Sequence, residues 1–355
     1  MTTQPIELAT KLPRLAAATV TGLALAAALA GCGDSHTATT GPGGAPQVKI
    51  MVGGIDKVIY LPAKLTEQLG YFKAEGLDVQ LLSEPSGAQA ENVLVAGDVQ
   101  GVVGFYDHAI DLQTKGKCIQ SVVQFADVPG EVEVVATGKA DQITSPADFA
   151  GKNLGITSTG SSTDFLTQAL AVRNGVSPDK FTRVKAGAGA TFISAIDNGG
   201  IDGGMTTDPT AAQLTTTGKA RVIVDMRTEE GTKAALGGLY PASSLYMDCA
   251  WVKANKPVVQ KLANALVKTL RFINGNSAEE IAAKMPAEYA GADPKLYVKA
   301  INDTKTIFTS DGVMPADGAK NVLEVLSSFS PNVMGKKDAI DLAATYTTEF
   351  ASAVK

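Results

Sequence analysis

The sequence predicts an α/β fold built as two lobes, and three observations lead to this. Short β-branched or apolar runs alternate with helical periods along most of the chain, which is typical of α/β units with parallel strands. Residues 32–355 form a stretch longer than one hydrophobic core usually holds. Everything beyond Lys256 reads as helices, which could pack back on the first lobe, so that the chain crosses between lobes twice.

The N-terminal 31 residues have the pattern of a secretory signal peptide. Lys11 and Arg14 precede a run of small and apolar residues, Leu15–Ala30. A membrane-spanning helix needs about 20 apolar residues. This run is shorter and leads into polar sequence rather than a basic flank, which disfavours the alternative of a retained membrane helix. Residues 32–47 have no apolar periodicity, and we expect a flexible tether there.

Residues 48–127 are expected to begin the first lobe. Val48–Val52 is predicted as a strand, and leucines at four-residue spacing predict the helix that follows it. Pro62 suits the first turn of this helix and Gly70 its end. The remaining elements expected in this part are strands at 77–81, 101–104 and 119–125 and a helix around 93–95.

Residues 128–244 are expected to form the second lobe, and residues 245–355 return to the first. Strands are predicted at 132–136, 154–156, 182–184, 203–205 and 222–224, and helices at 162–173, around 193–196 and at 211–214. A longer strand is predicted at Ser244–Val252, with Trp251 in the core.

The chain has three cysteines, which limits the disulfides that it can form. Cys32 follows the apolar run directly, which leaves Cys118 and Cys249 for one disulfide in an oxidising compartment. The sequence leaves this pairing open, because it does not place the two Cβ atoms within bonding distance.

The loop Thr157–Thr163 is the first candidate site, because ligands of open α/β sheets bind beyond the carboxyl ends of strands. Its hydroxyls and N–H groups lie at the start of a helix, where the dipole favours an anion. The candidate ligand residues here are Ser158, Gly160, Ser161 and Ser162. Capping of the helix by one or two hydroxyls is the alternative.

Other strand-following loops hold the remaining candidates. Asp208 precedes Pro209 at a helix start, where it could cap the helix, face a ligand, or do both. Asp107 could contact a ligand or be a solvated turn residue. Tyr60 and Phe105 could supply the apolar walls of a small-molecule site, with core packing as the alternative.

Several function classes are excluded. A net charge of −5 without a basic cluster argues against nucleic acid as a partner. The chain has no phosphate-binding G-x-x-x-x-G-K-[ST], no H-E-x-x-H and no G-x-S-x-G motif, and we expect no metal, no cofactor and no catalytic residue. A histidine mechanism would rest on His108 beside Asp107, because His36 lies in the tether, and no nucleophile accompanies them.

Two stretches resemble known families. Leu29-Ala30-Gly31-Cys32 resembles the lipobox of bacterial lipoproteins, which implies lipidation of Cys32. The segment from Gln68 to Val79, QLGYFKAEGLDV, is similar to the nitrate/sulfonate/taurine-type solute-binding proteins, relatives of the thiamine-pyrimidine-precursor binders. Weaker matches fall in the family's order, and the last of them corresponds to the family's return strand, beginning with Ala250–Val252, and its long helix. These matches are Tyr60–Ala63, Ala147–Gly155, Gly160–Ser162, Asp208-Pro209 and Ala250–Leu270.

The resemblance implies a type II periplasmic binding protein fold, with two Rossmann-like lobes joined by a two-segment hinge. The hinge is expected near residues 127–131 and 240–244, and closure over the solute would use contacts from both lobes. By position, the family's ligand contacts fall on Tyr60, Phe105, Asp107, Gly160, Ser161, Ser162 and Asp208. We see no arginine in the strand-following loops, so a clamped dianion is disfavoured relative to a neutral or singly charged solute.

The implied function is that of the solute-binding component of an ABC importer, with the permease and its ATPase as partners. We expect a monomer that is lipid-anchored in the cell envelope, in the periplasm or on the outer face of the cytoplasmic membrane. The expected solute is small and organic, anionic or zwitterionic, as sulfonates and taurine are. The alternatives are a lipid-anchored enzyme or ligand sensor on the same scaffold, and a binder of pyrimidines, thiamine precursors or aromatic carboxylates.

Overall fold

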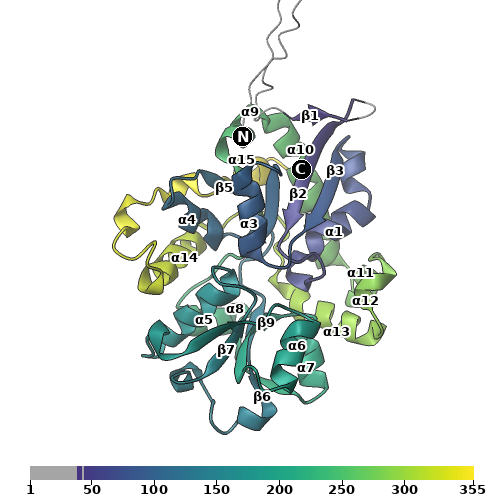
Figure 1. Cartoon of the computed structure of the whole chain (residues 1–355). Coiled ribbons are helices and arrows are strands. Elements are labelled where there is room, and N and C mark those ends of the chain that lie inside the picture. Colours follow the sequence, from purple (N-terminus) through teal and green to yellow (C-terminus); the bar gives the residue numbers. More distant parts are fainter. Residues whose placement is uncertain (1–37, 42–43) are drawn as a thin grey trace, which may run out of the picture. The chain divides into compact units, whose positions relative to one another are not determined.

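The computed structural model describes residues 38–41 and 44–355 (Figure 1). The expected signal peptide and Cys32 lie outside the described residues. The last part of the expected tether is attached to the body, because β1 (Thr39–Thr40) pairs antiparallel with β2 (Pro46–Val52). Among the described residues, no helix has the length and apolar character needed to cross a bilayer.

Lobe I is the part of the chain built on the first sheet. The sheet has the order β1-β2-β4-β11-β5, with β3 paired to β2. β2 is parallel to β3 and β4, but β11 is antiparallel to β4 and to β5. The expectation of parallel strands is therefore wrong for β11, which enters this sheet on its return from the second lobe. The strand bounds are β3 Asp78–Ser83, β4 Gly101–Phe105, β5 Ile119–Gln124 and β11 Ser243–Asp248.

Lobe II is built on the second sheet, with the order β10-β6-β9-β7-β8. β7 is parallel to β8 and β9, whereas β6 is antiparallel to β9 and β10, so the expectation of parallel strands is also wrong for β6. Helices α5 and α8 lie on one side of this sheet and α6 and α7 on the other (Figure 1). The bounds are β6 Glu131–Ala136, β7 Asn153–Ile156, β8 Thr182–Lys185, β9 Gly203–Thr207, β10 Ala220–Asp225, α5 Ser162–Arg173, α6 Ala190–Asp197, α7 Thr210–Thr216 and α8 Glu229–Leu236.

Two segments carry the chain between the sheets, one from β5 to β6 and one from α8 to β11. They are hydrogen-bonded to each other: the N–H of Tyr240 donates to the carbonyl of Asp127 at 3.2 Å, and that of Ala242 to Ala126 at 2.9 Å. Two sheets joined by two paired crossovers confirm the expected fold class.

The first helices of lobe I follow the sequence closely. Pro62 lies in the first turn of α1 (Leu61–Gln68), and Gly70 has the positive φ of 72° that favours glycine after a helix. The chain also forms a short 3₁₀ turn, η1 (Val58–Tyr60), and α2 (Tyr71–Ala74), α3 (Gly87–Ala96) and α4 (Asp107–Gln113).

The strand expected at Ser244–Val252 is shorter than predicted. β11 ends at Asp248, and α9 (Cys249–Ala254) begins there because an Asp248 carboxylate oxygen accepts the N–H of Trp251 at 2.9 Å. The sequence from Ala250 to Val252 is therefore helix rather than return strand. Trp251 is buried, as predicted.

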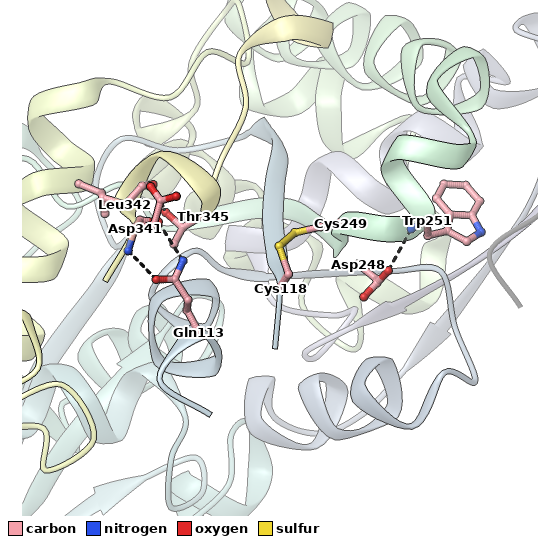
Figure 2. Close-up of a disulfide and its surroundings, with 8 residues drawn as sticks. All are labelled: Gln113, Cys118, Asp248, Cys249, Trp251, Asp341, Leu342 and Thr345. Carbon is pink, nitrogen blue, oxygen red and sulfur yellow. Dashed lines mark hydrogen bonds between the residues drawn. A yellow bond between two sulfur atoms is a disulfide. The ribbon is translucent and has the colours of Figure 1, made fainter. Parts of the chain in front are cut away.

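The C-terminal helices contact both lobes. α13 packs against η1 of lobe I and α7 of lobe II, and α14 packs against α4 and α5. The Gln113 side chain holds the segment after α14 through two hydrogen bonds with the backbone of Asp341, at 2.8 and 2.7 Å (Figure 2). These helices are α10 Lys256–Gly275, α11 Ala278–Ala282, α12 Ala287–Ala290, α13 Pro294–Thr304, α14 Ala316–Phe329 and α15 Glu349–Ser352.

Cys118 and Cys249 form a disulfide, the pairing that the sequence left open (Figure 2). Their Cα atoms are 5.4 Å apart, and the N–H of Cys249 donates to the carbonyl of Cys118 at 3.0 Å. The bond joins the chain just before β5 to the start of α9 and so closes a loop that contains the whole of lobe II.

Candidate functional site

The loop Thr157–Thr163, which precedes α5, provides hydrogen-bond partners for several of its own N–H groups. Thr163 accepts the N–H of Thr157 at 2.9 Å, and the Ser161 hydroxyl accepts the N–H of Ser158 at 3.3 Å. The N–H of Gly160 donates to Asp164 at 2.8 Å. Three of the N–H groups that an anion would use are thus engaged within the loop and the first turn of α5. Ser161 is the N-cap residue of α5, but its hydroxyl bonds to the loop and does not accept an N–H of the helix, so the capping interpretation is not borne out for this side chain.

Two other hydroxyls of this loop reach lobe I. The Ser158 hydroxyl donates to the hydroxyl of Ser86, the N-cap of α3, at 3.0 Å. The Ser162 hydroxyl donates to the Asp107 carboxylate at 2.9 Å and lies 3.5 Å from His108 Nε2. Contacts from both lobes therefore meet at the N-terminus of α5, in a closed arrangement.

Asp107 is the centre of this interface between the lobes. It is fully buried at the start of α4, and its second carboxylate oxygen accepts the hydroxyl of Tyr240 at 2.9 Å. Burial raises the pKa of Asp107, while His108 and the two hydroxyl donors oppose that shift. This burial excludes the alternative that Asp107 is a solvated turn residue. Asp56, which also follows a strand of lobe I, is exposed and does fit that description.

Tyr60 and Phe105 lie together as an apolar wall. Their rings are arranged edge to face with centroids 6.4 Å apart, and both are buried. The charges of Glu131 and Asp107 add to burial in raising the pKa of Tyr60 well above its usual value. These aromatic rings therefore border the charged groups of the interface while also belonging to the core of lobe I.

Asp208 is engaged within the protein. Its carboxylate accepts the N–H of Ala212 at 2.9 Å, the hydroxyl of Thr304 in α13 at 2.8 Å, and an N–H of Arg227 at 3.1 Å. The first of these bonds is the helix-capping role. The backbone carbonyl of Asp208 also accepts the N–H of Val58 in lobe I at 3.0 Å.

Arg227 corrects one sequence expectation. It lies in the loop after β10, so the statement that the strand-following loops contain no arginine is wrong. The periodicity places that strand correctly, and Arg227 follows its last residue by two positions. The guanidinium is already paired with Asp208 at 3.1 Å and with Asp225 at 2.6 Å.

Sequence reasoning missed the buried charges of the interface. Lys57 is buried in the loop after β2, where its ammonium donates to the carbonyls of Gly53 at 2.8 Å and Pro85 at 3.3 Å. Glu131, the first residue of β6, is also buried. The sequence held a signal for these buried charges. Glu131 and Glu133 alternate with valines in β6, a central strand that is buried on both faces and would ordinarily be apolar throughout.

His108 and Glu91 form a buried ion pair beside Asp107. His108 Nδ1 lies 2.8 Å from the Glu91 carboxylate. Burial disfavours the imidazolium, but the attraction and hydrogen bond of Glu91 outweigh it and raise the pKa of His108 to about 9. His108 is thus held by a carboxylate of α3 in a charged state, which is poorly suited to accept a proton at neutral pH.

Comparisons with known proteins agree with the fold and the resemblance. The chain matches the profile of the NMT1/THI5-like family over residues 60–280. A solved structure of a protein from Bordetella bronchiseptica RB50 is 34% identical, with a TM-score of 0.82, over 86% of this chain and 96% of that one. The alkanesulfonate-binding protein SsuA from Xanthomonas axonopodis pv. citri, bound to MOPS, has a TM-score of 0.69 at 18% identity, over 86% and 99% of the two chains, and this likeness concerns the fold.

One curated relative is a synthase by name, and it matches part of the chain. The 4-amino-5-hydroxymethyl-2-methylpyrimidine phosphate synthase of Schizosaccharomyces pombe is 25% identical over 146 residues, which are 41% of this chain and 40% of that protein. The match thus spans well under half of the synthase. The profile match across most of the folded chain and the solved relative at 34% identity confirm the resemblance found in the sequence. The chain therefore belongs to the NMT1/THI5-like family.

Proposed function

We propose that the chain is the extracytoplasmic solute-binding component of an ABC importer, and that it captures a small organic solute by closure of the two lobes. One observation carries the proposal: buried polar groups from both lobes meet at the Asp107–Ser162 hydrogen bond, beside two paired crossovers. A solute that contacts both lobes at once binds the closed state better than the open one, and its binding therefore favours closure. The likeness to an alkanesulfonate-binding protein supports this reading.

The crossovers supply the proposed hinge. We propose that the lobes move about residues 127–131 and 240–244. Strands β1 to β5 and β11 then move as part of lobe I, and strands β6 to β10 as part of lobe II. α13 and α14, which contact both lobes, would slide against α7 and α5 during the motion. A solute would then have access when the Asp107–Ser162 and Ser86–Ser158 bonds are open.

The Ser86–Ser158 contact offers a direct test of closure. Because the two hydroxyl oxygens are 3.0 Å apart across the lobes, the Ser86→Cys/Ser158→Cys variant should form a disulfide only in the closed state. Oxidised variant should neither take up nor release solute in a dialysis assay, and reductant should restore exchange. The Ser86→Ala/Ser158→Ala variant controls for loss of the hydroxyls. If the oxidised variant exchanged solute as fast as the same variant after treatment with reductant, lobe closure would be refuted.

We also propose anchoring through a lipid on Cys32, which keeps the carrier beside its permease. The lipobox-like segment that ends at Cys32 supports this. Mass spectrometry of protein from the membrane fraction should find an acylated N-terminal cysteine, and Cys32→Ser should release the protein from membranes. Recovery of the serine variant in the membrane fraction at the original level would contradict the anchor.

A second candidate is an enzyme or ligand sensor on the same scaffold, or a binder of a pyrimidine. The match to the pyrimidine phosphate synthase favours it. Incubation with aminopyrimidines, followed by mass spectrometry, separates the two: a binder returns them unchanged. Product formation that depends on Asp107 and His108 would replace the transport proposal with an enzymatic one.

A further inference from the structure

Several buried polar oxygen atoms near the crossovers have no hydrogen-bond partner within the described chain. Glu131 is 3% exposed and has one carboxylate oxygen without a donor. The hydroxyls of Ser243, Ser244 and Tyr246 are in the same condition, and these side chains are fully buried. Leaving such groups unmatched costs free energy, so native proteins seldom do so without a functional reason.

Glu131 and Ser243 lie where the chain passes between the lobes. Glu131 opens β6, where the chain enters lobe II, and Ser243 opens β11, where the chain returns to lobe I. The charges of Lys57, Asp107 and His108 all act on Glu131. Glu131 is therefore in the neighbourhood of the Asp107–Ser162 bond rather than in a separate part of lobe II.

The fixed cations around this interface are already engaged. Lys57 donates to backbone carbonyls, His108 is paired with Glu91, and Arg227 is paired with Asp208 and Asp225. Within the described chain, the carboxylate of Asp107 accepts hydrogen bonds from the hydroxyls of Ser162 and Tyr240. An incoming anion would thus meet two carboxyl groups and would find hydroxyl groups, rather than unpaired cations, as its donors.

We propose that the captured solute carries a protonated nitrogen base, an amine or an amidine, and that Glu131 accepts its N–H group. This inference rests on the proposed function, because it names the class of solute that the closing lobes take. A charged N–H donor would satisfy the unmatched carboxylate oxygen and offset the negative charge of Asp107 nearby. Of the solutes expected from the sequence, a zwitterion such as taurine carries such a nitrogen group, whereas a simple sulfonate does not.

Binding of such a solute must release a proton. Burial and Asp107, opposed by Lys57 and His108, raise the pKa of Glu131 to about 8 in the solute-free protein. A bound cation favours the carboxylate and lowers that pKa. Affinity should therefore rise with pH, by up to about tenfold per unit between pH 6 and 8, and level off above 8. A sulfonate that accepted a hydrogen bond from the protonated Glu131 carboxyl would need that group to keep its proton, and its affinity would fall as pH rises.

The test uses matched probes on the full chain freed of co-purified solute by unfolding and refolding. Benzamidine, benzylamine, benzoate and benzenesulfonate share a ring of similar size and differ in charge. Isothermal titration calorimetry at pH 6, 7 and 8, in two buffers of different ionisation enthalpy, gives affinity and proton release, and small-angle scattering gives compaction. We expect binding by the amidine or amine, affinity that rises with pH, and release of about one proton at pH 6–7.

Glu131→Gln is the critical variant and Glu133→Gln its matched control. Glu133 lies two residues further along β6 and is equally buried without a hydrogen-bond partner. Glu131→Gln should weaken amidine binding at least tenfold and abolish its pH dependence, whereas Glu133→Gln should leave both unchanged. If neither nitrogen base binds, or if both variants behave alike, the inference fails.

The outcome also separates this inference from the proposed function. If benzoate or benzenesulfonate binds and compacts the protein while the nitrogen bases do not, the solute class is wrong and the carrier function stands. If no probe binds or compacts the protein, and native mass spectrometry of freshly purified protein finds no bound solute, both proposals fail.

Discussion

The disulfide between Cys118 and Cys249 should stabilise the protein mainly through the unfolded chain. The two cysteines are 131 residues apart in sequence, and the loop between them holds every strand of lobe II and both crossovers. Cross-linking removes loop-closure entropy from the unfolded state, and for a loop of 131 residues this amounts to about 5 kcal/mol at 25 °C. Measured effects are usually smaller, so we expect a loss of about 3–5 kcal/mol without the bond.

Urea denaturation of the wild type and of Cys118→Ala/Cys249→Ala checks this expectation. With a urea dependence of about 3 kcal/mol per molar, the midpoint should fall by roughly 1–1.7 M, while the slope rises because the unfolded chain expands. Wild type treated with reductant is the matched control, since Cys118 is exposed and reachable. A loss below about 1 kcal/mol in both samples would refute the loop-entropy argument.

Three further predictions concern single groups. Ser162→Ala removes the donor to Asp107 across the lobes and should weaken solute binding about three- to tenfold by calorimetry; unchanged affinity would show that this bond does not hold the closed state. Asp248→Ala removes the cap of α9 and should cost about 1 kcal/mol, or roughly 2–4 °C in Tm by calorimetric scanning, whereas Asp248→Asn should retain most of it. The pKa of His108 is raised to about 9, so its contribution to stability is complete below about pH 6.5 and lost as pH rises through 9; Glu91→Gln should flatten this part of the urea-stability profile.

Local patterns were sufficient for most helices and strands. α5 begins and ends where the periodicity places it, and Pro62 and Gly70 bound α1 as expected, because caps and breakers act over a few residues. Asp248 shows the limit of this reasoning. The same apolar run fits a strand or a helix, and a single side-chain cap decided that β11 stops there.

The candidate site was predictable in its location and less so in its chemistry. Strand-following loops do bring Asp107 and Ser162 together, as the topology of α/β folds requires. The partners of Asp208 were not readable, since Arg227 and Thr304 are 19 and 96 residues away in sequence. Charge pairing over such separations depends on how the lobes and α13 pack, which no local pattern encodes.

The sequence by itself determined the α/β class, the two-lobe organisation, the order of nearly all elements and the two cysteines available for pairing, because periodicity, turns and composition are local properties. The tertiary structure alone decided that β11 runs antiparallel to its neighbours, that Cys118 and Cys249 are bonded, and that Glu131 lies buried beside Asp107. These depend on groups brought together from distant parts of the chain, and their balance of charge is what points to the class of solute.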